Sequence, residues 1–149
     1  MEPAVWMSLI LVFFLTILSV QDVRSGYVSL YVIAAAAAAG TVLYIFFPQC
    51  SPGSLLVLLA VCSIPILPAV FGRQRIGAGD ALILPVCALY LGRAVLAVLL
   101  FASFFAAGAA AVCLLLRKAR RTDTIRFFPF LLAAEALYGV ALFWESAAG

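Results

Sequence analysis

Long uncharged stretches alternate with short polar ones along the whole chain. There are six apolar segments: Ala4–Val20, Tyr27–Phe47, Ser54–Phe71, Ala81–Gly92, Ala94–Leu116 and Phe127–Trp144. A helix that crosses a bilayer needs about 20 predominantly apolar residues, and most of these segments come close to that length. The pattern therefore predicts an all-α, polytopic membrane protein with six transmembrane helices. No internal repeat or linker divides the chain, so we expect one domain over residues 1–149.

Two of the segments contain features that disturb a regular helix. Pro65 and Pro68 are expected to kink or unwind the second half of Ser54–Phe71, because proline lacks a backbone donor and clashes with the preceding turn. Ala81–Gly92 reaches a spanning length only if Ile76–Asp80 also lies within the membrane. We therefore expect irregular backbone at that point, beside a cavity that can satisfy it.

The second segment contains an alanine run, Ala34–Ala39, followed by Gly40. Small side chains let helix backbones approach one another closely in lipid. We interpret the run as a packing face and not as a site.

The basic residues are distributed unequally between the loops that six spans would create. Eight of the nine fall on one side of the membrane: Arg24, Arg73, Arg75, Arg117, Lys118, Arg120, Arg121 and Arg126. The other side receives only Arg93. Because basic loops stay in the cytoplasm, this bias predicts that both termini lie outside and that Asp22 and Asp80 lie at the cytoplasmic face.

Composition supports an integral membrane protein and excludes several classes of function. The chain is 68% hydrophobic and 10% charged, with a mean hydropathy of +1.27, far from the composition of a soluble domain. Its net charge of +3 comes from short loops without interleaved aromatic residues, so no nucleic-acid partner is expected. The first segment could be a signal peptide, but Glu2 replaces the basic start and no cleavage site follows. We expect a retained helix, in the cell membrane.

The chain contains no histidine, which excludes Ser-His-Asp and Cys-His catalysis and histidine-ligated zinc. The four cysteines, Cys50, Cys62, Cys87 and Cys113, form no CxxC pair, and three of them lie within apolar segments. Their expected role is that of small buried hydrophobic residues, with a structural disulfide or metal site as the alternative. We expect no metal and no cofactor. Any catalysis would then depend on carboxylates or cysteines.

Two acids stand at the ends of apolar segments. Asp22 follows the first segment, and Asp80 precedes the fourth, directly after Gly77-Ala78-Gly79. They are 58 positions apart in the sequence, yet the topology brings both to the same membrane face. Two carboxylates that meet there could hold a water and share one proton, since two adjacent negative charges repel. Gly77 and Gly79 would allow the backbone to turn beside a cavity.

Helix ends suggest which acid plays which part. Asp80 lies near a helix N-terminus, where the helix dipole favours the carboxylate, and Asp22 lies near a C-terminus, where it does not. Our hypothesis is that Asp80 is the ionised base and Asp22 the protonated acid.

Structural roles remain open for each of these residues taken alone. Asp22 beside Arg24 could belong to an ordinary interfacial turn, and Asp80 could be a helix N-cap. Arg24, like Arg73 and Arg75, could anchor the topology, tune the acids or meet acidic lipid head groups. Glu135 lies inside the last segment, where an acid is either functional or a neutral, hydrogen-bonded group within the bundle.

Three stretches of the chain resemble the type IV prepilin peptidases, in particular their short forms and the archaeal preflagellin peptidases. Asp22-Val23-Arg24-Ser25-Gly26-Tyr27-Val28 is similar to the family's Asp-x-Arg-x-x-x-Ile, and Gly77-Ala78-Gly79-Asp80 is its Gly-x-Gly-Asp motif. Ile125-Arg126-Phe127-Phe128-Pro129-Phe130-Leu131 is similar to a late Ile-Pro-Phe-x-Pro-Phe segment. The resemblance implies a membrane aspartyl peptidase with Asp22 and Asp80 as the catalytic acids.

The resemblance also implies a substrate. It is a pilin-like precursor with a short basic leader and a hydrophobic N-terminal helix, cut at the cytoplasmic face. Ser29-Leu30 and Leu82 depart from the family's usual Pro-Asn and Lys. The soluble CxxC-bearing insert of longer members is absent, so N-methylation of the product is not expected.

Two other classes of function remain as alternatives. Broken apolar segments and membrane acids would also suit a proton- or cation-coupled transporter, although the acids stand at one face and no internal repeat is visible. A noncatalytic membrane scaffold would account for the apolar bulk but not for the two acids.

Overall fold

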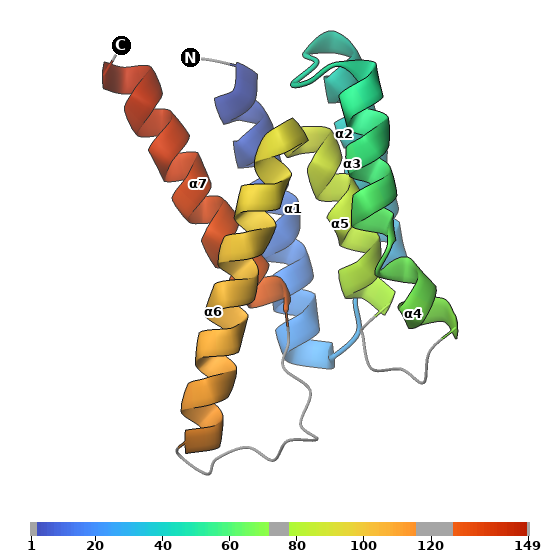
Figure 1. Cartoon of the computed structure of the whole chain (residues 1–149), viewed down its shortest axis with the longest axis vertical. Coiled ribbons are helices and arrows are strands. Elements are labelled where there is room, and N and C mark those ends of the chain that lie inside the picture. The colour runs from blue at the N-terminus through green and yellow to red at the C-terminus, as the bar shows by residue number, and fades with distance from the viewer. Residues whose placement is uncertain (1–2, 72–77, 116–126, 149) are drawn as a thin grey trace.

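Helices make up all the regular structure in the computed structural model, which describes residues 3–71, 78–115 and 127–148. The elements are α1 (Pro3–Ser25), α2 (Leu30–Phe46), α3 (Pro52–Ser63), α4 (Ile66–Phe71), α5 (Ala78–Leu91), η1 (Gly92–Ala94), α6 (Val95–Leu115) and α7 (Phe128–Ala148). They form a bundle in which the start of α1 and the end of α7 lie at the same end (Figure 1). We call this the terminal end.

Four stretches of the described chain are long and apolar enough to cross a membrane: Pro3–Ser25, Pro52–Ala69, Gly79–Cys113 and Phe128–Ala148. The apolar helix α2 is shorter, with 17 residues. The stretch Gly79–Cys113 contains α5 and α6, which run in opposite directions on either side of η1 (Figure 1). The all-helical, multi-pass architecture is thus confirmed, and the count of six spans and the orientation stay predictions.

The helix α5 occupies the middle of the bundle and contacts α1, α2, α3, α4 and α6. Its side chains at Ile83, Cys87 and Tyr90 are almost completely buried. The structure differs from expectation at its start, because Ala78, Gly79 and Asp80 already belong to the regular helix. The expected irregular backbone is therefore wrong for these three residues, and Ile76 and Gly77 lie outside the described residues.

The expected break in the third segment is confirmed at Pro65, whereas Pro68 lies within α4 and does not interrupt it. The helix α3 ends at Ser63 and α4 begins at Ile66, with Pro65 between them. The Ile64 N–H donates to the Val61 carbonyl at 3.2 Å, a tighter turn than an α-helix makes. Proline at position 65 cannot donate the bond that would continue α3.

One stripe of the alanine run packs as expected. Ala36 is fully buried, whereas Ala34, Ala35 and Ala38 are exposed. One turn further on, a Cβ at Gly40 would lie 2.6 Å from the ring of Tyr90, so only glycine permits this approach of α2 to α5. The Tyr90 hydroxyl donates to the Ala36 carbonyl at 2.8 Å, which satisfies it inside the apolar core.

The cysteines are free thiols. Cys62 and Cys87 are buried within the core, Cys50 is half-buried and Cys113 is exposed. The expected buried position is confirmed for Cys62 and Cys87 and is wrong for Cys113, which lies on the outer surface of α6. No group of three or more potential metal ligands occurs within residues 3–71, 78–115 and 127–148.

Candidate functional site

Asp22 lies in the last turn of α1. The Gly26 N–H donates to the Asp22 carbonyl at 3.0 Å, and Gly26 itself has a positive φ of 69°, which stops the helix there. The side chain of Asp22 is half-buried. Its Oδ2 atom is buried and has no hydrogen-bond partner among the described residues. Burying a carboxylate oxygen without a hydrogen-bond partner is costly. The Asp22 carboxylate is therefore a strong candidate for a group that binds a ligand.

The turn after Asp22 is held by two polar side chains that the sequence reading missed. Gln21 Oε1 accepts a hydrogen bond from the Ser29 N–H at 3.2 Å, at the start of α2. Ser25 Oγ lies within hydrogen-bond distance of the Gln21 carbonyl, at 2.8 Å, and of the Tyr27 carbonyl, at 3.0 Å. These bonds fix the path of the chain from α1 to α2 beside Asp22. Their signal in the sequence is only a cluster of turn-forming polar residues.

Asp80 is the third residue of α5 and is half-buried. It lies inside the first turn, so the N-cap role considered above does not apply to it. The preceding residue explains how close α5 comes to its neighbours. A Cβ at Gly79 would lie 3.1 Å from the Val28 Cβ and 3.7 Å from the Phe128 ring. Gly79 therefore packs between the α1–α2 connection and the start of α7.

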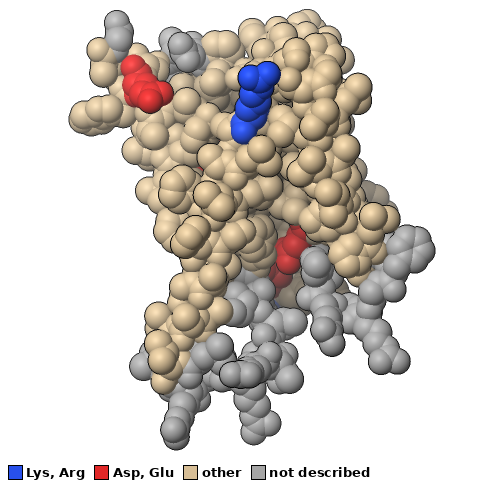
Figure 2. Space-filling view, in the orientation of Figure 1, with Lys and Arg blue, Asp and Glu red and all other residues tan. Residues whose placement is uncertain are grey.

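The fold brings Asp22 and Asp80 together. The end of α1 and the start of α5 lie at the end of the bundle opposite the terminal end (Figure 1), and the two carboxyl groups are close enough for their charges to repel each other. Figure 2 shows acidic side chains reaching the surface in a recess toward that end. We call Asp22 and Asp80 the acid pair. Like charges at close range disfavour the ionisation of both groups at once.

The other predicted site residues differ in how they relate to this pair. Arg24 is exposed in the last turn of α1, and no carboxylate within the described ranges forms an ion pair with it. Gly77, Arg73 and Arg75 lie outside the described residues, so their predicted roles stay predictions.

Glu135 stands apart from the acid pair. Its side chain is fully buried on α7, and its Oε1 accepts a hydrogen bond from the Ser8 hydroxyl of α1 at 2.7 Å. Its Oε2 has no partner among the described residues. A Cβ at Gly139 would lie 2.9 Å from Ser8 Oγ, so this glycine makes room for the hydroxyl. The arrangement is that of a hydrogen-bonded acid within the bundle, which was one of the two roles considered. Sequence reasoning missed Ser8 and Gly139.

Comparison with known protein families matches residues 9–112 to the type IV leader peptidase family. The matched range includes both Asp22 and Asp80 and stops before Glu135. Neither the comparison with curated proteins nor the comparison with solved structures finds a match. The family match covers well over half of the chain and agrees with the motifs that the sequence presents at Asp22 and Asp80. The chain therefore belongs to the type IV leader peptidase family.

Proposed function

We propose that this protein is a membrane aspartyl endopeptidase that removes the short basic leader from pilin-like precursors at the cytoplasmic face, with Asp22 and Asp80 as its catalytic acids. Family membership supports a protease that acts on precursors of this type. The single observation that carries the proposal is the convergence of two half-buried carboxyl groups, 58 positions apart in the sequence, at one end of the bundle.

The acid pair can carry out hydrolysis without histidine or metal. One carboxylate takes a proton from a water held between the acids, and the water oxygen attacks the carbon of the scissile peptide. The protonated partner donates to the carbonyl oxygen and stabilises the charge that develops there. Collapse of the tetrahedral intermediate breaks the C–N bond, and the leaving nitrogen takes up a proton from the acid pair. As the carbonyl re-forms, a hydroxyl of the intermediate returns its proton to the pair. The products leave as a carboxylic acid and an amine, and the pair again holds one proton.

The helix ends favour different protonation states in the two acids. Asp80 lies in the first turn of α5, where the helix dipole favours a carboxylate, and Asp22 lies in the last turn of α1, where it does not. The dipole thus favours Asp80 as the base, whereas the half-burial of Asp80 near Asp22 opposes its ionisation, so either acid can begin the reaction as the base. Since the proton is shared, the macroscopic titration belongs to the pair.

The position of the pair suits a substrate that is itself a membrane helix. With six spans and both termini outside, as the basic residues favour, the pair lies at the cytoplasmic interface. A hydrophobic substrate helix would reach it sideways through the bilayer. Its basic leader would remain in the cytoplasm, and the peptide to be cut would have to be non-helical at this level to expose its carbonyl.

Leader cleavage in cells provides a direct test. The protein is co-expressed with a tagged pilin-like precursor, and loss of the leader is followed by the change in electrophoretic mobility. Asp22→Asn and Asp80→Asn each keep the size of the side chain and remove the carboxylate. We expect each to lower the cleavage rate by at least about a thousand-fold, the order expected when a residue that acts as part of a catalytic unit is removed.

Glu145→Gln is the matched control, because Glu145 is an exposed carboxylate near the end of α7. It should cleave as the unchanged protein does. Membrane insertion and thermal stability of all three variants are measured in parallel. Cleavage that persists in both aspartate variants, with the protein inserted and stable, would rule out the acid pair as the catalytic group.

A further inference from the structure

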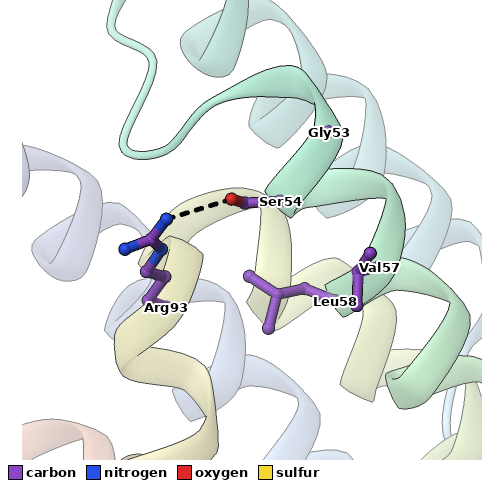
Figure 3. A pocket seen from close by; sticks show the side chains of 5 residues that line it. All are labelled: Gly53, Ser54, Val57, Leu58 and Arg93. Carbon is purple, nitrogen blue, oxygen red and sulfur yellow. Dashed lines mark hydrogen bonds between the residues drawn. The ribbon is translucent and has the colours of Figure 1, made fainter.

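A cavity of about 380 Å³ lies between the first turns of α3 and the short helix η1 (Figure 3). It is lined by Gly53, Ser54, Val57, Leu58 and Arg93. We call it the Arg93 pocket. It lies toward the terminal end of the bundle, away from the acid pair, where η1 joins α5 to α6 (Figure 1). Neither the family match nor the proposed peptidase chemistry gives it a role.

The turn that builds the pocket depends on Gly92. This glycine has a positive φ of 53°, and a Cβ there would lie 3.1 Å from the Cβ of Gln49. Only glycine adopts this conformation without strain in so close a contact. The turn places Arg93 against the start of α3, whose N-terminus is capped by Ser51 Oγ accepting from the Ser54 N–H at 3.4 Å.

Arg93 carries a charge that the described protein does not neutralise. Its guanidinium donates to Ser54 Oγ at 3.1 Å (Figure 3). No acidic side chain in residues 3–71, 78–115 and 127–148 pairs with it. A guanidinium offers five N–H donors, so most of its donor capacity remains for an anion. It is also the exception in the charge pattern, because the eight other basic residues fall on the opposite side of the predicted topology.

An apolar track leads away from the pocket along α3. Val57 lines the pocket, and Val61 follows it one turn later on the same face of α3. Ile64 continues the track just past the end of the helix. All three are exposed. A ligand that fits these features has an anionic head at Arg93 and a long apolar chain beside α3.

We propose that the Arg93 pocket binds the phosphodiester head group of a phospholipid, with one acyl chain lying along Val57, Val61 and Ile64. The head group of a lipid in the leaflet at the terminal end lies at the level of a loop between two spanning helices. Guanidinium groups bind phosphate oxygens through paired, charge-assisted hydrogen bonds. The Ser54 hydroxyl is hydrogen-bonded to Arg93 and so holds the guanidinium in one orientation at the pocket.

Photolabelling tests the site. The purified protein in dodecyl maltoside micelles, which carry no phosphate, is mixed with phosphatidylglycerol bearing a diazirine in one acyl chain. After irradiation, modified peptides are mapped by mass spectrometry. We expect adducts concentrated on α3 between Val57 and Ile64. The same diazirine chain on diacylglycerol, which lacks the phosphate, should label α3 several-fold less.

Variants of the pocket locate the interaction. Arg93→Gln should lower labelling of α3 about five-fold, from the typical contribution of one basic residue to the binding of an anionic head group. Arg93→Lys should retain part of it, because an ammonium keeps the charge but loses the paired donors. Arg24→Gln removes an exposed arginine from the other end of the molecule and should leave labelling of α3 unchanged.

The proposal is overturned if Arg93→Gln, shown to be folded by its melting temperature, labels as the unchanged protein does. Equal labelling by the diacylglycerol probe would overturn it too, as would loss of the adducts in excess inorganic phosphate, which would point to a soluble anion. Ser54→Ala provides a second variant if Arg93→Gln is unstable. Ser54→Ala should lower labelling only slightly, because the charge of Arg93 stays in place. The decrease should be smaller than the difference in labelling between Arg93→Lys and Arg93→Gln.

Discussion

Gly79 is the residue on which the geometry of the acid pair depends most closely. It carries no side chain because a Cβ would come within 3.1 Å of Val28 and approach the ring of Phe128. Val28 belongs to the connection that follows Asp22, and Asp80 is the next residue after Gly79. A methyl group at position 79 would therefore require Val28 or the start of α5 to shift by a few tenths of an ångström, directly beside Asp80.

This contact makes Gly79→Ala a test of spacing. The added methyl should push the first turn of α5 away from Val28 and move Asp80 relative to Asp22. We expect leader cleavage to fall by up to about ten-fold, since the shift needed is a fraction of the 1 Å displacement that can cost about a hundred-fold. The measurement is the cleavage rate of a purified precursor at saturating substrate.

The control for this change is Gly108→Ala. Gly108 lies in α6, and a Cβ there meets nothing within 4 Å. Alanine also stabilises a helix more than glycine does. This variant should therefore be as active and at least as stable as the unchanged protein. Equal activity of Gly79→Ala and Gly108→Ala would show that the close contact does not control catalysis.

At the scale of helices, the bundle is held by a few polar or close contacts among many interchangeable apolar ones. The first and last helices, α1 and α7, are joined by the Ser8–Glu135 hydrogen bond, and α2 and α5 by the Tyr90 hydroxyl bonded to Ala36. Apolar surface alone does not drive helices together in lipid, since lipid chains are equally apolar. Specific contacts of this kind then decide which helices pair and in what register.

Removing the hydroxyl at position 8 should weaken the α1–α7 contact. In Ser8→Ala, Glu135 Oε1 loses its donor inside an apolar core. We expect a loss of about 0.5–2 kcal/mol in stability, the range measured for hydrogen bonds between membrane helices, seen as a lower melting temperature in detergent. Ser103→Ala is the control, because Ser103 is exposed and bonds only to the Leu99 carbonyl of its own helix. A melting temperature equal to that of the control would contradict the role of the bond.

The α2–α5 contact gives a graded prediction. Tyr90→Phe removes one hydrogen bond, whereas Gly40→Ala places a Cβ 2.6 Å from the Tyr90 ring and must displace that ring or separate the helices. We expect Gly40→Ala to lower the melting temperature more than Tyr90→Phe, since overpacking of this kind costs about 1–3 kcal/mol. The reverse order, measured under the same detergent conditions, would show that the hydroxyl and not the close approach dominates this contact.

For the molecule as a whole, the sequence predicts a multi-pass helical protein but not how its helices face one another. Segment ends could be found because prolines, glycines and charges interrupt apolar runs, as at Pro65 and Gly92. The approach of Asp22 and Asp80 could be anticipated because one follows an apolar segment and the other precedes one, on the same predicted side.

The sequence carries no such signal for the direction in which each face of a helix points. Lipid-facing side chains are as apolar as buried ones, so Phe13 and Trp144 are exposed while Leu11 is fully buried, without any change of residue class. The contacts Gly79–Val28, Gly40–Tyr90 and Ser8–Glu135 depend on helix rotation and tilt. They therefore required the structure.

Orientation in the membrane is testable on the whole molecule. In a cysteine-free background, Ser51→Cys places a thiol before α3, toward the terminal end, and Ser25→Cys places one at the opposite end. The positive-inside rule predicts that an impermeant maleimide labels Ser51→Cys in intact cells, and Ser25→Cys only after permeabilisation. The opposite pattern would put the acid pair outside the cell and remove the basis for cytoplasmic cleavage.

The packing of α1 against α7 has a consequence for how the protein is made. Of the helices described, α1 packs most extensively against α7, and Ser8 lies 127 positions before Glu135, its hydrogen-bond partner. Until α7 has been synthesised, one flank of α1 must be covered by lipid or by the insertion machinery. A chain released before α7 would expose Ser8 to the hydrocarbon of the bilayer.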